Sequence, residues 1–232
     1  MFMSGNPSRV FLDVGAHFGE SIFKALNPRL HFDLIVAFEP SNVGCERLKR
    51  IKSKNVQIEQ YGLGASDIEL TLFGAGYLGG SIFSEKINLY KAEITEKIQI
   101  QDAATVLRPY LEKFDECFLK LNCEGSEIAI IKSLANNGLL SKFKSIYIDW
   151  DARKIPSLKK EITLSKKLLN QASSRYVNAD SFHVTGWKGV QIWLSRYEDV
   201  QSKRITTFRY STFGFLPLNL RIKEIIKQVV LR

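Results

Sequence analysis

The sequence predicts an α/β fold in which helices cover both faces of a mostly parallel, twisted β-sheet. Two observations support this prediction. Short apolar runs alternate with helical patterns from the first residues onward, which is typical of βαβ units with parallel strands. Apolar residues make up 45% and charged residues 25% of the 232 residues, the composition of an ordinary globular domain with a sizeable core.

The first half of the chain contains the clearest alternation. Strands are expected at Val10–Asp13, Leu34–Glu39 and Val56–Tyr61, and helices near Ser21–Leu26 and over Asn42–Ile51. Two further strands, Ile68–Phe73 and Lys97–Gln101, are expected around a glycine-rich loop, Gly74–Ser81.

The second half continues the pattern with helices at Ala103–Leu111 and from about Ser126 to Asn136. Phe118–Asn122 and Ser145–Asp149 are apolar enough to be buried strands, and Leu158–Gln171 is a basic amphipathic helix. Tyr176–Asn178 and Gly189–Ser195 are expected to form a closing strand pair, and Leu218–Leu231 a terminal helix.

The chain length suits one large domain, and no internal repeat or linker is visible. We therefore expect one domain over residues 1–200, followed by a basic tail over residues 201–232. That tail holds seven basic residues and a single acid, Glu224, so most of the formal charge of +9 lies there.

The basic tail suits an anionic surface such as a membrane, a lipid diphosphate or a nucleic acid, although solubility alone would also explain it. As a helix, Leu218–Leu231 would carry a broad apolar stripe with cations outside it. It could lie in a membrane interface, or pack on the sheet or on a second subunit.

Cysteines and histidines are few and scattered, three of each, without metal-ligand spacing or a disulfide pattern. We expect no metal site and favour a reducing, cytoplasmic location, with peripheral membrane contact through the tail as an option. Neither a signal peptide nor an apolar run long enough to span a bilayer is apparent.

The strongest local signal is a turn that follows the first strand. Asp13 begins an Asp-x-Gly-x-x-x-Gly pattern in which Gly15 and Gly19 flank Ala16 and His17. Glycine permits a sharp turn and close approach to a ligand, and a helix N-terminus follows at once. The acid at the strand end suits a cationic ligand; a turn without any ligand is the alternative.

A second acid stands at the end of the second strand. Glu39 precedes Pro40 and Ser41, and Pro40 ends the strand. A carboxylate at this place can accept hydrogen bonds from both hydroxyls of a ribose. Two acids at successive strand ends make a nucleotide-type ligand the favoured interpretation.

A third motif follows the strand Phe118–Asn122. It brings Lys120, Asn122 and Glu124 to the carboxyl edge of the sheet, where open α/β folds bind ligands. Glu124 and Glu127 could instead be acids that stabilise the start of the next helix.

DVGAHFGES, AFEPSN, GGSIF and LKLNCEGSE, in this order, resemble the FkbM-type methyltransferases over roughly residues 9–150. The resemblance implies a Rossmann-like class I methyltransferase fold and S-adenosyl-L-methionine as cofactor. The first motif would bind its methionine end, with Asp13 accepting from the ammonium, and Glu39 would bind the ribose. The reaction implied is methyl transfer to a hydroxyl, most often on a sugar, so the expected partner is a saccharide, glycolipid or nucleotide-sugar acceptor.

Two positions depart from the family pattern, which commonly has Asn at position 17 and Asp at position 122. Asn122 is neutral and cannot act as a general base. Glu124, His17, Asp149 and Asp151 remain as candidates for that role. His17 keeps a hydrogen-bonding side chain in the turn, and a role in orienting the cofactor or capping the helix is favoured.

Weaker features complete the predicted site. Gly62 and Leu63 follow the third strand, where related folds contact adenine. Ser81, after two glycines, is a candidate for an acceptor-side loop. Asp149, Trp150 and Asp151 resemble a sugar platform, although Trp150 could equally be a core residue.

Two other functions remain open. A nucleic-acid methyltransferase is suggested by the sequence pI near 9.4 and the basic tail, but no RNA-binding module is recognisable, so no nucleic-acid partner is expected. A non-catalytic protein that only holds cofactor or glycan is suggested by Asn122, whereas the retained acids Asp13, Glu39 and Glu124 argue against it.

Overall fold

The computed structural model describes residues 6–184 and 187–199. Described residues up to Tyr197 belong to one compact unit. The basic tail, with its predicted helix Leu218–Leu231, lies outside the described residues. No helix within the described ranges is long and apolar enough to cross a bilayer.

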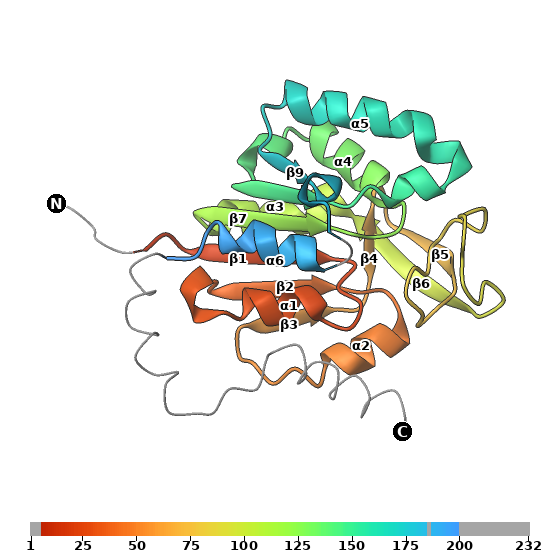
Figure 1. The fold of residues 1–232 in the computed structure, drawn as a ribbon, viewed down its shortest axis with the longest axis horizontal. Helices are drawn as coiled ribbons and strands as arrows, with labels where there is room; N and C mark the ends of the chain where they lie inside the picture. The colour runs from red at the N-terminus through yellow and green to blue at the C-terminus, as the bar shows by residue number, and fades with distance from the viewer. Residues whose placement is uncertain (1–5, 185–186, 200–232) are drawn as a thin grey trace. The chain divides into compact units, whose positions relative to one another are not determined.

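The centre of the unit is a six-stranded sheet in the order β3-β2-β1-β7-β8-β9, with every neighbouring pair parallel (Figure 1). The strands are β1 (Arg9–Val14), β2 (Leu34–Phe38), β3 (Val56–Glu59), β7 (Glu116–Leu121), β8 (Ser145–Ile148) and β9 (Tyr176–Asn178). The chain first moves outward from β1 to β3 and later returns to pair β7 with the other side of β1. The strand order therefore reverses between β1 and β7, the place where open α/β sheets bind ligands.

Helices cover both faces of this sheet (Figure 1). The helices are α1 (Glu20–Ala25), α2 (Asn42–Leu48), α3 (Ala103–Lys113), α4 (Glu127–Asn136), α5 (Lys159–Gln171) and α6 (Lys188–Ser195). Short 3-10 helices are η1 (Pro28–Leu30), η2 (Leu140–Lys142), η3 (Asp151–Lys154), η4 (Pro156–Leu158) and η5 (Ala179–Phe182).

The two cores follow the alternation of side chains along β1. Val10 and Leu12 pack in one cluster with residues of α3, α4 and α5, such as Ile131. Phe11 points to the opposite face and packs in a second cluster with α1 and α6. All five residues from Val10 to Val14 are buried, as expected for a central parallel strand covered on both faces. The Rossmann-like α/β fold predicted from the sequence is confirmed.

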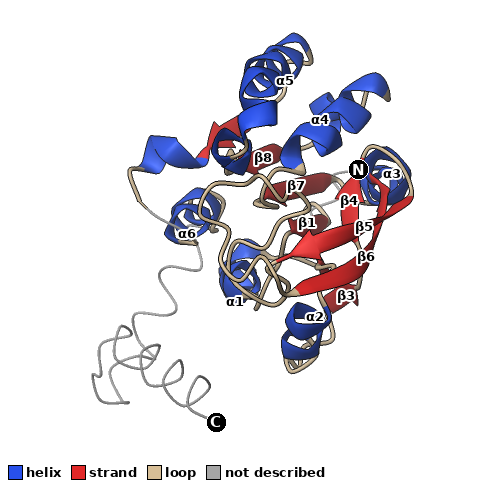
Figure 2. Cartoon of the chain, turned by 90° about the vertical axis from the view of Figure 1, so that its right-hand side faces the viewer, coloured by secondary structure: helices blue, strands red, loops and turns tan. Residues whose placement is uncertain are grey.

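A smaller sheet lies beside the carboxyl ends of β1 and β2 (Figure 2). It contains β4 (Gly62–Gly64), β5 (Ile68–Phe73) and β6 (Thr95–Asp102) in the order β4-β6-β5. β5 and β6 pair antiparallel around the loop 74–94, and β4 pairs parallel with β6. The two extra strands predicted from the sequence are present, whereas β4 was not predicted.

The prediction of a strand at Gly189–Ser195 is wrong, because this segment is helix α6. Its short apolar pattern fits both the two-residue repeat of a strand and the 3.6-residue repeat of a helix. In the structure Val190, Trp193 and Leu194 are buried together, while Ile192 is 40% exposed. That spacing is helical. The indole N–H of Trp193 donates to the Ser145 hydroxyl at 2.9 Å, which ties α6 to β8.

Candidate active site at the carboxyl edge of the sheet

A cavity lies at the carboxyl ends of β1, β2 and β7, where the strand order reverses, and the small sheet and the loop 74–94 form its other wall. Residues predicted from five separate segments of the sequence line it together. They are Gly15, His17, Glu39, Pro40, Ser41, Gly62, Leu63, Ser81, Asn122 and Glu124. The strand ends thus bring residues more than 100 positions apart to one site, as the sheet topology requires.

Gly15 makes the close approach between β1 and β7 possible. A Cβ on Gly15 would lie 2.0 Å from the Asn122 carbonyl oxygen, and its φ of +75° is left-handed. The Gly15 N–H donates to the Phe38 carbonyl at 3.0 Å, so β2 also holds the turn. Ala16 is buried and Gly19 caps α1 with a left-handed φ. Both shape the turn without lining the cavity.

Glu39 is a buried carboxylate fixed by neighbouring donors. Its Oε2 accepts from the His17 N–H at 2.8 Å, and its Oε1 accepts from the Ser41 N–H at 3.0 Å and the Ser41 hydroxyl at 2.7 Å. Burial raises the pKa of Glu39, while these hydrogen bonds oppose that shift. Because a carboxylate has about four acceptor sites, these bonds leave about one further site on Oε2, fewer than two ribose hydroxyls would use.

Asp13 and Lys120 are not among the residues that line the cavity, so the roles expected of them from the sequence stay predictions. Asp13 is fully buried, and its Oδ1 lies 2.8 Å from the Lys120 ammonium. Lys120 also donates to the Gly15 carbonyl at 2.7 Å. Asp13 is therefore paired with a lysine of this chain through Oδ1, while its buried Oδ2 has no partner among the described residues, and Lys120 connects β7 to the turn after β1.

His17 lies on the same side of the cavity as Glu39. Its φ of +50° is left-handed, its Nδ1 lies 3.0 Å from Glu20 Oε1, and its ring stacks on Phe18 at 3.6 Å. The buried Nε2 has no partner in the described structure. A polar atom buried without a partner is costly, so this nitrogen is a candidate contact for a bound ligand.

Glu124 provides the carboxyl group on the opposite side. It follows β7 in a left-handed conformation, with φ of +55°, and its carbonyl accepts from the Ser81 hydroxyl at 2.7 Å. Burial is the largest cause that raises the pKa of Glu124, the negative charge of Asp151 adds to it, and Lys86 opposes it. Strained backbone of this kind is common at functional sites.

Asn122 lies between the two sides. Its N–H donates to the Val14 carbonyl at 3.2 Å, which continues the contact between β1 and β7. Its side-chain amide can orient a hydroxyl but cannot take a proton from it.

The predicted sugar platform at Asp149, Trp150 and Asp151 is not part of the cavity. Trp150 is 2% exposed and packs in the core under α4 and α5, so the core alternative is the one realised. Asp151 is buried in an ion pair with Lys154. Burial raises the pKa of Asp149 to about 6, but its carboxylate lies 3.4 Å from Arg153. Glu124 and His17 are thus the base candidates that line the cavity.

Two features of the site were missed by sequence reasoning. Lys86 forms a 2.6 Å ion pair with Glu124 from within the loop 74–94. Tyr77 lines the cavity, is 39% exposed, and contacts the ring of Tyr90 edge-on at 5.3 Å between centroids. The nearby glycines Gly79 and Gly80 indicated a loop at this place, but neither Lys86 nor Tyr77 lies in a recognisable motif.

The described residues contain no group of three or more His, Cys, Asp or Glu that could hold a metal ion. Cys45, Cys117 and Cys123 are free thiols, and burial raises the pKa of each. None of the three is poised as a nucleophile, because a reactive cysteine needs a lowered pKa.

The model of the methyltransferase FkbM domain matches residues 13–165, well over half of the chain. The chain belongs to the FkbM methyltransferase family. The matched segment runs from the end of β1 into α5 and contains every cavity-lining residue predicted from the sequence. No match is found among curated proteins.

Among solved structures, this chain is similar to methyltransferase FkbM from Methylobacillus flagellatus KT, with 18% sequence identity and a TM-score of 0.42. The similarity covers 70% of this chain and 37% of that one, so this chain spans well under half of the solved protein's length.

Proposed function

We propose that the protein is an S-adenosyl-L-methionine-dependent O-methyltransferase that acts on a sugar hydroxyl in glycan or polysaccharide biosynthesis. The observation that carries the proposal is that one cavity holds a buried carboxyl group, Glu39, and a partly buried one, Glu124, with different surroundings. Glu39 is fixed by backbone and hydroxyl donors, and Glu124 is paired with a lysine. The first suits binding of a ribose, and the second suits proton transfer.

The residues around Glu39 fit the donor. Gly15 lets the chain pass close to a ligand, and the one acceptor site left on Glu39 Oε2 suits a ribose hydroxyl. Gly62 and Leu63 lie in the same wall as Leu72, Ile98 and Ile100, an apolar surface suited to the faces of an adenine. The unpartnered Nε2 of His17 supplies a further polar contact.

The chemistry expected of the chain is modest. When bound, S-adenosyl-L-methionine supplies a sulfonium methyl whose leaving group is neutral, so the protein needs no general acid. The chain has to orient the acceptor hydroxyl and take its proton as the new bond forms. Glu124 takes the proton, and Asn122 holds the hydroxyl by a hydrogen bond. A raised pKa improves Glu124 as a proton acceptor near neutral pH.

The acceptor we propose is a saccharide, a glycolipid or a nucleotide sugar. With Trp150 in the core, the exposed aromatic residue that lines the cavity within the described part of the chain is Tyr77, and its ring contacts that of the exposed Tyr90. Such rings offer an apolar face for the C–H side of a sugar and a hydroxyl for its polar side. This pair supports a sugar acceptor in place of the platform expected at Trp150.

The test has two parts. Calorimetry should show S-adenosyl-L-methionine and S-adenosylhomocysteine binding in the low micromolar range, on the order of 7 to 8 kcal/mol. A panel with methyl-labelled donor should then label glycans and leave tRNA and rRNA unlabelled. Absence of cofactor binding ends the proposal, and stoichiometric labelling of RNA would favour a nucleic-acid methyltransferase instead. Cofactor binding without turnover on any acceptor would favour the non-catalytic alternative.

We also propose that the protein acts in the cytoplasm and that the basic tail brings it to anionic membranes that carry lipid-linked acceptors. Seven basic residues in positions 201–232 support this. Sedimentation with liposomes should show binding that requires anionic lipid and fades with salt. Equal binding to neutral liposomes would contradict it.

A further inference from the structure

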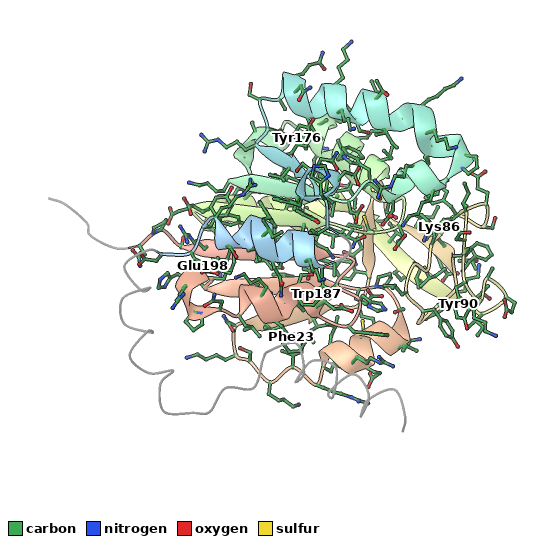
Figure 3. All side chains as sticks on the ribbon, in the orientation of Figure 1. Phe23, Lys86, Tyr90, Tyr176, Trp187 and Glu198 are labelled. Atoms are coloured by element: carbon green, nitrogen blue, oxygen red, sulfur yellow. The ribbon has the colours of Figure 1, made fainter. Side chains whose placement is uncertain are left out.

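Lys86 is a buried cation that no sequence motif predicted. It lies in the loop between β5 and β6 (Figure 3), and its side chain is 4% exposed. A lysine is rarely buried unless its charge is paired. Its ammonium has two partners from different segments, the Glu124 carboxylate at 2.6 Å and the Gly79 carbonyl, to which it donates a hydrogen bond.

The glycine loop and Glu124 meet at this ammonium. A Cβ on Gly79 would lie 3.2 Å from the Lys86 Nζ and 3.8 Å from the Glu124 Oε1. The Ser81 hydroxyl donates to the Glu124 carbonyl, and Ser81 pairs with Phe73 at the start of the loop. The loop 74–81 is therefore held against Glu124 by side chains as well as by its own backbone.

Among the charged groups around Glu124, Lys86 has the most direct influence on whether the Glu124 carboxyl is protonated. Asp151 repels the ionised carboxyl, and Lys154 attracts it but is already paired with Asp151. Lys86 is the cation in direct contact, and it engages Oε2 of Glu124. That contact leaves Oε1 as the oxygen able to take a proton. Without Lys86, this partly buried carboxyl beside Asp151 would be protonated over a wider pH range.

We propose that Lys86 is a positioning residue that keeps Glu124 ionised in the cavity and holds the glycine loop 74–81 closed beside it. The role in catalysis rests on the proposed function, in which Glu124 is the base. The two physical consequences, a lower proton affinity of Glu124 and a closed loop, do not depend on any substrate.

The experiment is an NMR titration of the protein with carbon-13-labelled glutamate carboxyls, with the Glu124 signal assigned by its loss in Glu124→Gln. Lys86→Met should move the titration midpoint of Glu124 upward by roughly one to three pH units. Lys86→Arg, which keeps the charge, should return most of that shift. The matched control is Lys97→Met, an exposed lysine on β6, which should leave the midpoint unchanged.

Hydrogen exchange provides the readout for the loop. In Lys86→Met the amides of Gly80 and Ser81, which donate to Tyr77 and Phe73, should exchange at least several-fold faster. If Lys86→Met does not fold, the same measurements are made on Lys86→Gln, which keeps an N–H donor but loses the charge and is one bond shorter.

A midpoint that does not move in Lys86→Met, or that moves equally in Lys97→Met, overturns the proposal. Unchanged exchange of Gly80 and Ser81 overturns the part that concerns the loop. The titration needs neither cofactor nor acceptor. A shifted midpoint in a protein without methyl transfer would therefore reject the proposed function alone, and an unmoved midpoint in an active enzyme would reject the role of Lys86 alone.

Discussion

The two sides of the cavity are stabilised in different ways. On the side of Glu39, the carboxylate is held by two backbone N–H groups and one hydroxyl from adjacent strand ends. On the side of Glu124, the carboxylate is held by the ammonium of Lys86, from a loop in the middle of the chain. Neutral backbone donors create a fixed binding site, whereas the ion pair controls a charge. The first arrangement suits binding and the second suits proton transfer.

The largest effect is expected from Glu124→Gln, which tests whether the Glu124 side of the cavity provides the base for methyl transfer. The amide cannot take a proton, so kcat should fall by about 10²- to 10⁴-fold while the Kd of the cofactor stays within about twofold. Steady-state kinetics and calorimetry measure the two quantities. Glu85→Gln, which changes an exposed carboxyl in the loop 74–94, is the control and should keep full activity. Normal turnover by Glu124→Gln would remove the distinction between the two sides.

Gly15→Ala tests whether the site depends on the close approach of β1 and β7. A left-handed alanine costs about 1–2 kcal/mol, and its Cβ would also collide with the Asn122 carbonyl. We expect a loss of about 2–5 kcal/mol in the free energy of unfolding, measured by denaturant titration. Gly138→Ala is the matched control, because Gly138 has a φ of +66° and nothing within 4 Å of its Cβ position. Equal losses in both variants would show that the close approach contributes nothing.

Glu39→Ala sharpens the comparison from the binding side. Loss of the one charge-assisted hydrogen bond left to the ligand should weaken cofactor binding by about 2 kcal/mol, roughly 30-fold in Kd, with little change in kcat at saturating cofactor. Calorimetry gives the affinity. Glu46→Ala, an exposed acid on α2, should leave the affinity unchanged. A Glu39→Ala protein that binds normally would show that this carboxylate does not contact the cofactor.

The pH profile separates the two carboxyl groups by their roles. The base must be ionised, so kcat/KM should fall about tenfold per pH unit on the acid side. The midpoint should lie above the ordinary glutamate value of 4.5, because burial and Asp151 raise the pKa of Glu124. Because Glu124 and Asp151 interact, this midpoint is an apparent pKa of the pair of carboxyl groups. An acid limb that stays at or below 4.5 would contradict the assignment of Glu124 as base.

The smallest effect is expected at the mouth of the cavity. Tyr77→Ala should raise the KM for the acceptor by about threefold to tenfold, because an aromatic contact contributes about 0.5–1.5 kcal/mol, and should leave the Kd of the cofactor unchanged. Initial rates at varied acceptor concentration measure it. Ile94→Ala, an exposed apolar residue of the same loop that does not line the cavity, is the control. If Tyr77→Ala changed only the Kd of the cofactor, Tyr77 would contact the cofactor and not the acceptor.

Predictions from the sequence succeeded where the cause is local. The turn after β1 was recognised because Gly15 and Gly19 must stand at a fixed distance after a buried strand. Glu39 was recognised because it directly follows β2. Helix α6 was mistaken for a strand because its short apolar pattern fits both periods, and only its packing against β8 decides between them.

The roles of Trp150 and Lys86 depend on contacts far along the chain. Trp150 is the second residue after β8, but it packs in one cluster with residues of α4 and α5, so its side chain is in the core. Lys86 meets Glu124 only because the loop between β5 and β6 lies against the end of β7. No local pattern reports such a contact.

The sequence by itself determined the parallel sheet, the turn after β1 and the acids that follow β2 and β7, because strand ends and glycine turns are encoded within a few neighbouring residues. The tertiary structure alone decided that Asp13 is paired with Lys120, that Trp150 is buried and that Lys86 holds Glu124. Burial and ion pairing depend on which distant segments pack together, and these in turn decide which carboxyl group remains available for a ligand.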